Sequence, residues 1–141
     1  MTYNVFGGTL NPTLLLTKNF VVVDAEQSGG LTLCPTDVVA TTGDCALMRA
    51  AGTNGGSLRW YRRPHDHPEG NTVIYTGEKM DHKQVDGRYF VAASRDQQEK
   101  DLVIRDVMSD DAGRYTVREV FSGQSAHANL VVVGKFIYLF I

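Results

Sequence analysis

The chain has 141 residues, of which 43% are hydrophobic and 21% charged, and its formal net charge is −2. This length predicts one domain with a buried hydrophobic core. The near-neutral charge provides no basic field, which argues against a nucleic-acid partner.

Residues 1–19 contain Gly7-Gly8 and Asn11-Pro12 and are predicted to form a flexible arm without the pattern of a secretory signal. After this arm, short runs rich in β-branched and aromatic residues alternate with Gly, Asp, Asn and Pro, while helical periodicity is nearly absent. This pattern is typical of a sandwich or barrel of short strands. The runs are residues 20–23, 31–33, 58–61, 72–75, 89–91, 102–104, 115–117 and 130–133.

One long interval interrupts this rhythm. Residues 35–57 are rich in Thr, Ala and Gly and are interpreted as a loop that is functional, disordered or carries a short element of its own. The folded domain is expected to span residues 20–134. Residues 135–141 form an apolar tail, shorter than the roughly 20 residues that cross a bilayer. The tail is the start of a truncated membrane helix, an added strand or an adhesive end, and the sequence leaves these three open.

Four motifs follow one another in the second half of the chain. They are LRWYRRP at residues 58–64, GRYF at 87–90, LVIRDV at 102–107 and DAGRYTV at 111–117. In this order they resemble strands C, D, E and F of an immunoglobulin domain of the V or I type. The resemblance implies an all-β, two-sheet Greek-key sandwich of V-type layout.

The resemblance also implies structural roles for several side chains. Trp60 is expected to fill the space between the sheets, and Tyr115 to bury its ring while its hydroxyl bonds a backbone group. Arg88 and Asp111 are expected to pair across the base of the sandwich. The inward-facing apolar positions, assigned from two-residue alternation, include Leu102, Ile104 and Val117.

The two cysteines depart from the family pattern, in which a disulfide joins strands B and F. The strand F position is Val117, and residues 31–33, interpreted as strand B, turn Cys34 outward or into a bulge. The inter-sheet bond is therefore not expected. A disulfide between Cys34 and Cys45 inside the long loop is the hypothesis, and two free thiols in a reducing compartment are the alternative.

Motifs for catalysis or metal binding are not convincing. His65-Asp66-His67 lies in a Pro-flanked turn without a third ligand at a recognisable spacing. No catalytic triad has supporting context, and no glycine pair precedes the Lys-Ser or Lys-Thr of a phosphate loop. We expect no enzyme activity, no metal, no cofactor and no small-molecule substrate.

The resemblance implies a recognition or adhesion domain of a cell-surface or secreted protein, of a self-recognition or immune type. Its partner would be another protein or a second copy, and it would contact a membrane only through a missing or truncated anchor. The alternative is an intracellular structural module of the I type, as in muscle or cytoskeletal proteins. The proposed binding face contains the outward-pointing residues Tyr61, Arg63, Thr116 and Arg118. Residues 35–57 and the turn at 121–123 form a rival site at the end of the sandwich.

Overall fold

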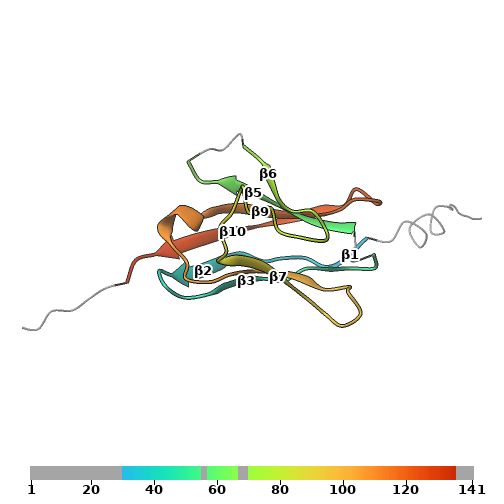
Figure 1. Ribbon diagram of the computed structural model, residues 1–141, viewed down its shortest axis with the longest axis horizontal. Helices are drawn as coiled ribbons and strands as arrows, with labels where there is room; N and C mark the ends of the chain where they lie inside the picture. Colours follow the sequence, from blue (N-terminus) through green and yellow to red (C-terminus); the bar gives the residue numbers. More distant parts are fainter. Residues whose placement is uncertain (1–29, 55–56, 67–69, 136–141) are drawn as a thin grey trace, which may run out of the picture.

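The computed structural model describes residues 30–54, 57–66 and 70–135. These residues form two packed layers of strands (Figure 1). The predicted arm at residues 1–19, the predicted strand at 20–23 and residues 136–141 of the apolar tail lie outside the described residues.

The described part of the chain is almost entirely strand and loop. A short 3-10 helix, η4 (Ser109–Asp111), precedes the ninth strand. The strands are β1 (Leu31–Leu33), β2 (Val38–Thr41), β3 (Ala46–Met48), β4 (Ala51–Gly52), β5 (Leu58–Pro64), β6 (Thr72–Tyr75), β7 (Tyr89–Ala93), β8 (Lys100–Ile104), β9 (Gly113–Glu119) and β10 (Ser125–Val133).

One layer is a five-stranded sheet in the order β2-β10-β9-β5-β6, in which β2 runs parallel to β10 and the other pairs are antiparallel. The facing layer has the order β3-β8-β7. The β1–β4 pair extends this second layer, because backbone bonds join Gly52 to Gln98 and Lys100 to Ala50 beside it. The prediction of an all-β, two-sheet sandwich is confirmed.

The core lies between the layers and is centred on Trp60 of β5, whose side chain has no exposed surface. Its indole Nε1 donates a hydrogen bond of 2.9 Å to the backbone carbonyl of Lys100 on β8, so this residue connects the two sheets. Strand alternation supplies the surrounding apolar side chains from both layers. Fully buried neighbours in the core include Leu102, Ile104, Tyr115 and Val117.

Residues 35–57 were interpreted as a loop that is functional, disordered or carries a short element of its own. The last alternative holds, but with three strands instead of one element, so the segment is not a single loop. The segment contains β2, β3 and β4, and β3 pairs with β8 in the register Met48 opposite Leu102. The run from Ala46 to Gly52 is therefore the strand that lies beside β8 in the core. Residues 31–33, which were interpreted as strand B, form β1 and pair only with the end of this run. Ala-, Met- and Gly-rich strands lack the β-branched residues by which strands are recognised in a sequence.

The predicted disulfide between Cys34 and Cys45 is not present, because both residues are free, exposed cysteines. The error follows from the misplaced loop. Cys34 precedes β2 and Cys45 follows it, and the four residues of β2 alone span about 13 Å. A disulfide requires Cα atoms within about 7 Å of each other. The inward positions of β3 are Ala46 and Met48, so an inter-sheet bond to Val117 has no cysteine on either side.

No helix in the described residues is long and apolar enough to cross a membrane.

Candidate functional site

The outer face of the five-stranded sheet carries the residues that were predicted to bind a partner. Alternation buries Trp60 on β5 and Val117 on β9 and turns their neighbours outward. Tyr61 lies directly opposite Thr116 in the β5–β9 register. Both side chains are half-buried, so they form the centre of this face.

Arg63 and Arg118 lie on opposite sides of the central pair. Arg63 is directly opposite Arg114, and Arg118 is directly opposite Arg59. The two rows are four residues apart, which corresponds to about 13 Å along a strand. The structure therefore brings Tyr61 and Thr116 together and places one predicted arginine at each end, rather than collecting all four residues in one cluster.

Arg59 and Arg114 belong to the same face but were not predicted. Each lies two residues before an outward-pointing residue, Tyr61 or Thr116, so the alternation already applied would have identified them. On the neighbouring strand β10, His127 lies opposite Thr116, and Asn129 lies opposite Arg114. Their position could not be inferred without the β9–β10 register.

An apolar margin borders this basic face at the β2 edge. Val39 is 70% exposed and lies beside Val131, which is 50% exposed, in the β2–β10 register. These valines point away from the core, because Ala40 and Leu130, their neighbours along the chain, are buried. The face thus changes from apolar at Val39 and Val131 to basic at the arginines of β9 and β5.

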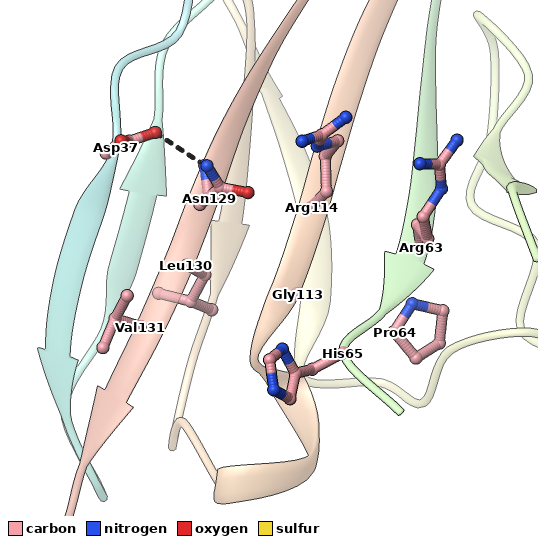
Figure 2. Close-up of a pocket in the computed structure, with 9 residues that line it drawn as sticks. All are labelled: Asp37, Arg63, Pro64, His65, Gly113, Arg114, Asn129, Leu130 and Val131. Carbon is pink, nitrogen blue, oxygen red and sulfur yellow. Dashed lines mark hydrogen bonds between the residues drawn. The ribbon is translucent and has the colours of Figure 1, made fainter. Parts of the chain in front are cut away.

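A shallow groove of about 490 Å³ lies at one end of the face, between β10, β9 and the end of β5 (Figure 2). The guanidinium groups of Arg63 and Arg114 stand side by side above it, and His65 lies near its lower end. Pro64 and Val131 contribute apolar walls. The other lining residues are Asp37, Gly113, Asn129 and Leu130.

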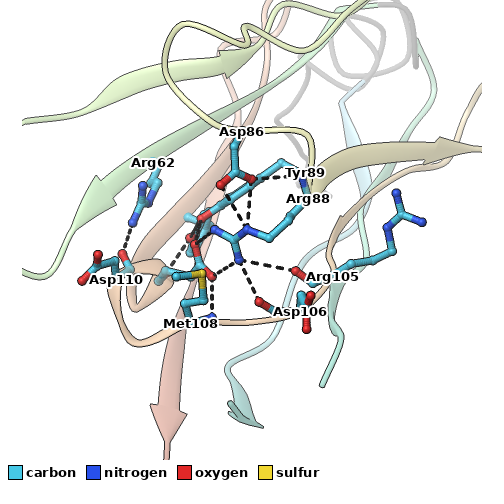
Figure 3. A network of polar contacts seen from close by, with 10 residues as sticks. Arg62, Asp86, Arg88, Tyr89, Arg105, Asp106, Met108 and Asp110 are labelled. Atoms are coloured by element: carbon cyan, nitrogen blue, oxygen red, sulfur yellow. Dashed lines mark hydrogen bonds and ion pairs between the residues drawn. The ribbon is translucent and has the colours of Figure 1, made fainter. Parts of the chain in front are cut away.

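A second polar cluster lies at the base of the sandwich (Figure 3). Arg88 binds both carboxylate oxygens of Asp111, at 2.7 Å and 3.0 Å. The same carboxylate accepts hydrogen bonds from the Tyr89 hydroxyl at 2.6 Å and the Met108 backbone N–H at 2.7 Å. Tyr115 donates its hydroxyl to the Asp111 carbonyl at 2.5 Å. This cluster fixes the turn before β9 and uses the Asp111 carboxylate within the fold.

The electrostatics of the cluster agree with a structural role. Burial raises the pKa of Asp111, but hydrogen bonds from Arg88, Tyr89 and Met108 outweigh burial and hold that pKa below its ordinary value. Burial raises the pKa of Tyr115 to about 12. Asp111 is therefore ionised and Tyr115 neutral across the physiological range.

Glu119 is a buried carboxylate that the sequence did not reveal. It ends β9, has no exposed surface, and accepts hydrogen bonds from the Ser57 hydroxyl and the Ser122 backbone N–H. Burial raises its pKa, but these hydrogen bonds outweigh burial, so the pKa lies below its ordinary value. Glu119 holds the β9–β10 turn against the start of β5.

Within the described residues, no three His, Cys, Asp or Glu side chains lie together in a way that could hold a metal ion. His67, a member of the His65-Asp66-His67 sequence, lies outside the described residues.

A family model described as an immunoglobulin V-set domain matches residues 35–133, which is more than half of the chain. No curated protein matches the chain at a significant level. The matched segment begins just before β2 and ends with β10, so it includes both layers and the whole outer face.

Proposed function

The chain belongs to the immunoglobulin V-set family, and from this premise we propose that it binds another protein through the outer face of its five-stranded sheet. Domains of this family are generally non-enzymatic and act in recognition or adhesion. The proposal adds the surface: Tyr61 at the centre, Thr116 beside it, and arginines at both ends.

The observation that carries this proposal is a sheet face, partly exposed among the described residues, with Tyr61 at its centre and arginines on both sides of it. Tyr61 and Arg63 are half-buried, and Arg118 is exposed. Tyr and Arg are among the residues that most often dominate the binding energy of protein interfaces. A face with no binding role would be expected to carry the threonines and paired charges of a solvated sheet.

We propose an extracellular or cell-surface location, which is typical of V-set domains, and a role in adhesion, self-recognition or immune binding. One observation favours the alternative of an intracellular structural module. Cys34 and Cys45 are free and exposed, and exposed thiols persist more readily in a reducing compartment. Antibody staining of intact and permeabilised cells separates the two: signal only after permeabilisation supports the intracellular module.

The binding face is tested by the double variant Tyr61→Ala/Arg118→Glu. The matched control is Phe90→Ala/Arg105→Glu, which changes an aromatic residue and an arginine on the outer face of the other layer, where the Arg105 guanidinium lies 5.1 Å from the Phe90 ring centre. Light scattering measures self-association, and a labelled multimer measures binding to cells of the source organism. Only the first variant is expected to lose association.

If both variants fold and associate like the unmodified chain, the outer face is not the binding surface. The rival site at the end of the sandwich then becomes the better candidate. Its turn at residues 121–123 begins with Phe121, which is 74% exposed, and follows Val120, which is 38% exposed. Loss of binding on Phe121→Ala alone would assign recognition to that turn.

A further inference from the structure

Two arginine pairs on the outer face oppose each other directly across neighbouring strands. Arg59 on β5 faces Arg118 on β9, and Arg63 on β5 faces Arg114 on β9. The Tyr61–Thr116 pair lies between these two arginine pairs. Like charges directly opposite each other in an antiparallel pair destabilise a sheet. The fold therefore carries two like-charge pairs in cross-strand register, each of which is expected to lower its stability.

Two arginines elsewhere in the described residues have acidic partners, whereas no ion pair is formed there by Arg62, Arg95 or Arg105. Arg49, on the other layer, forms ion pairs with Glu99 and Asp101. Arg88 binds Asp86 and Asp111. The chain has 16 acidic residues against 14 Lys and Arg, so the repeated Arg–Arg pairing is not imposed by composition. Violations of local stability rules concentrate at functional sites.

The four arginines of the outer face lack such partners. Among the described residues, no ion pair or side-chain hydrogen bond is formed by their guanidinium groups, and the Nε atom of Arg63 is buried without a hydrogen-bond partner. The outward positions of β5, β9 and β10 contain no Asp or Glu. Asp37 is the one carboxylate that lines the groove, and it accepts a hydrogen bond from the Asn129 backbone N–H at 2.8 Å.

We propose that the outer face binds an acidic surface of a different protein, with carboxylates seated in the groove between Arg63 and Arg114. Guanidinium groups recognise carboxylates through paired, charge-assisted hydrogen bonds. An acidic partner converts both repulsive arginine pairs into attractive contacts. This inference rests on the proposed function, because it specifies the partner of the same face.

A second copy of the chain is a poor occupant of this face. Two-fold pairing brings the same patch of each copy into contact. Four arginines on one copy would then meet four on the other, and like charges across an interface cost several kcal/mol. The apolar margin at Val39 and Val131 gives the acidic partner an adjacent hydrophobic contact.

The test uses the full chain and a defined probe, the peptide hexaglutamate, with hexaglutamine as its uncharged counterpart. Backbone NMR shifts are followed during titration at low and high salt. Hexaglutamate is expected to shift β5, β9 and β10 around the groove, with binding that weakens as salt increases. Hexaglutamine is expected to leave the spectrum unchanged.

The variant Arg63→Gln/Arg114→Gln should bind hexaglutamate about tenfold or more weakly. Arg49→Gln/Arg95→Gln removes the same charge from the other layer and should bind like the unmodified chain. Equal losses in the two variants, or shifts spread over both layers, would overturn the proposal. Stronger binding of a sulfated hexasaccharide than of hexaglutamate would also overturn it, in favour of a glycan.

The outcome is separable from that of the proposed function. Suppose cell binding is lost in Tyr61→Ala/Arg118→Glu but is unchanged in Arg63→Gln/Arg114→Gln and at high salt. Then the outer face is the binding surface and its partner is not acidic. A salt-sensitive dimer of the unmodified chain that disappears in Arg63→Gln/Arg114→Gln would instead make the second copy the occupant.

Discussion

Arginines in two regions of this molecule are treated in opposite ways. At the base of the sandwich, Arg88 donates to both oxygens of Asp111, whose side chain is only 2% exposed. On the outer face of the five-stranded sheet, Arg63 and Arg114 are paired with each other rather than with a carboxylate. In the first arrangement the positive charge is neutralised within the fold, whereas in the second it remains available to a partner.

The comparison shows that residue type alone does not reveal the role of a charge. In both regions arginine lies on or beside a strand, next to tyrosine. The difference is in what lies opposite: a buried carboxylate in one case and a second guanidinium in the other. The following predictions test whether removing an arginine lowers the stability of the chain in the first region and raises it in the second.

The largest effect is expected for Arg88→Gln. This change leaves the Asp111 carboxylate buried without its ion-pair partner, and breaking a buried pair costs roughly 3–5 kcal/mol. Because the Arg88 side chain is 23% exposed, we expect the lower end, about 3 kcal/mol. Chemical denaturation of both proteins measures the difference. A loss below about 1 kcal/mol would show that water or Tyr89 replaces Arg88, and that the base does not depend on this pair.

An intermediate effect on the stability of the fold is expected when the pH is lowered. Asp111 and Glu119 have pKa values below their ordinary values of 3.8 and 4.5. A lowered pKa in the folded state means that the unfolded chain takes up protons first, so stability is present above pH 4.5 and is lost as pH falls. We expect the thermal midpoint to be flat from pH 7 to 5 and to fall towards pH 3.

The acid prediction has its own control. Asp111→Asn removes one of the two titrating groups, so its midpoint should be lower at pH 7 but should fall less steeply towards pH 3. Parallel curves for Asp111→Asn and the unmodified chain would show that Asp111 does not contribute to the acid dependence.

The fold was largely predictable because the second half of the chain has strong signals. Residues 58–61 around Trp60 and residues 102–104 show the alternation of a strand. The turn before Tyr115 has the sequence Asp-Ala-Gly, which the family motif contains. Residues 35–57 failed for a physical reason. β3 and β4, in which Ala46, Met48 and Ala51 are buried, contain no β-branched residue and so lack the signal that indicates a strand. β2, with the sequence VVAT, does contain that signal.

The outer face was predictable only along each strand. Alternation from Trp60 and Val117 correctly turns Tyr61 and Arg118 outward, because the side-chain period of a strand is fixed at two. Which outward residues face one another depends on the register between strands, which the separate runs do not contain. The opposition of Arg63 and Arg114, and the groove beside them, therefore became visible only in the structure.

The smallest effect, and the most decisive for the comparison, is expected for Arg114→Gln. Removing one guanidinium relieves its repulsion with Arg63, and directly opposed charges change stability by roughly 0.2–1 kcal/mol. We therefore expect Arg114→Gln to stabilise the chain slightly, although the same substitution at residue 88 destabilises it. The gain should shrink in high salt, because half-exposed charges are screened.

A double-mutant cycle measures whether the interaction between Arg63 and Arg114 is repulsive or attractive. The cycle Arg63→Gln with Arg114→Gln should yield a repulsive coupling energy, since the second substitution gains nothing once the first has removed the repulsion. The cycle Arg88→Gln with Asp111→Asn should yield an attractive one. An attractive coupling between Arg63 and Arg114 would mean that the two guanidinium groups stack favourably in the folded chain. The face would then be stable by itself, and the argument for an acidic partner would lose its physical basis.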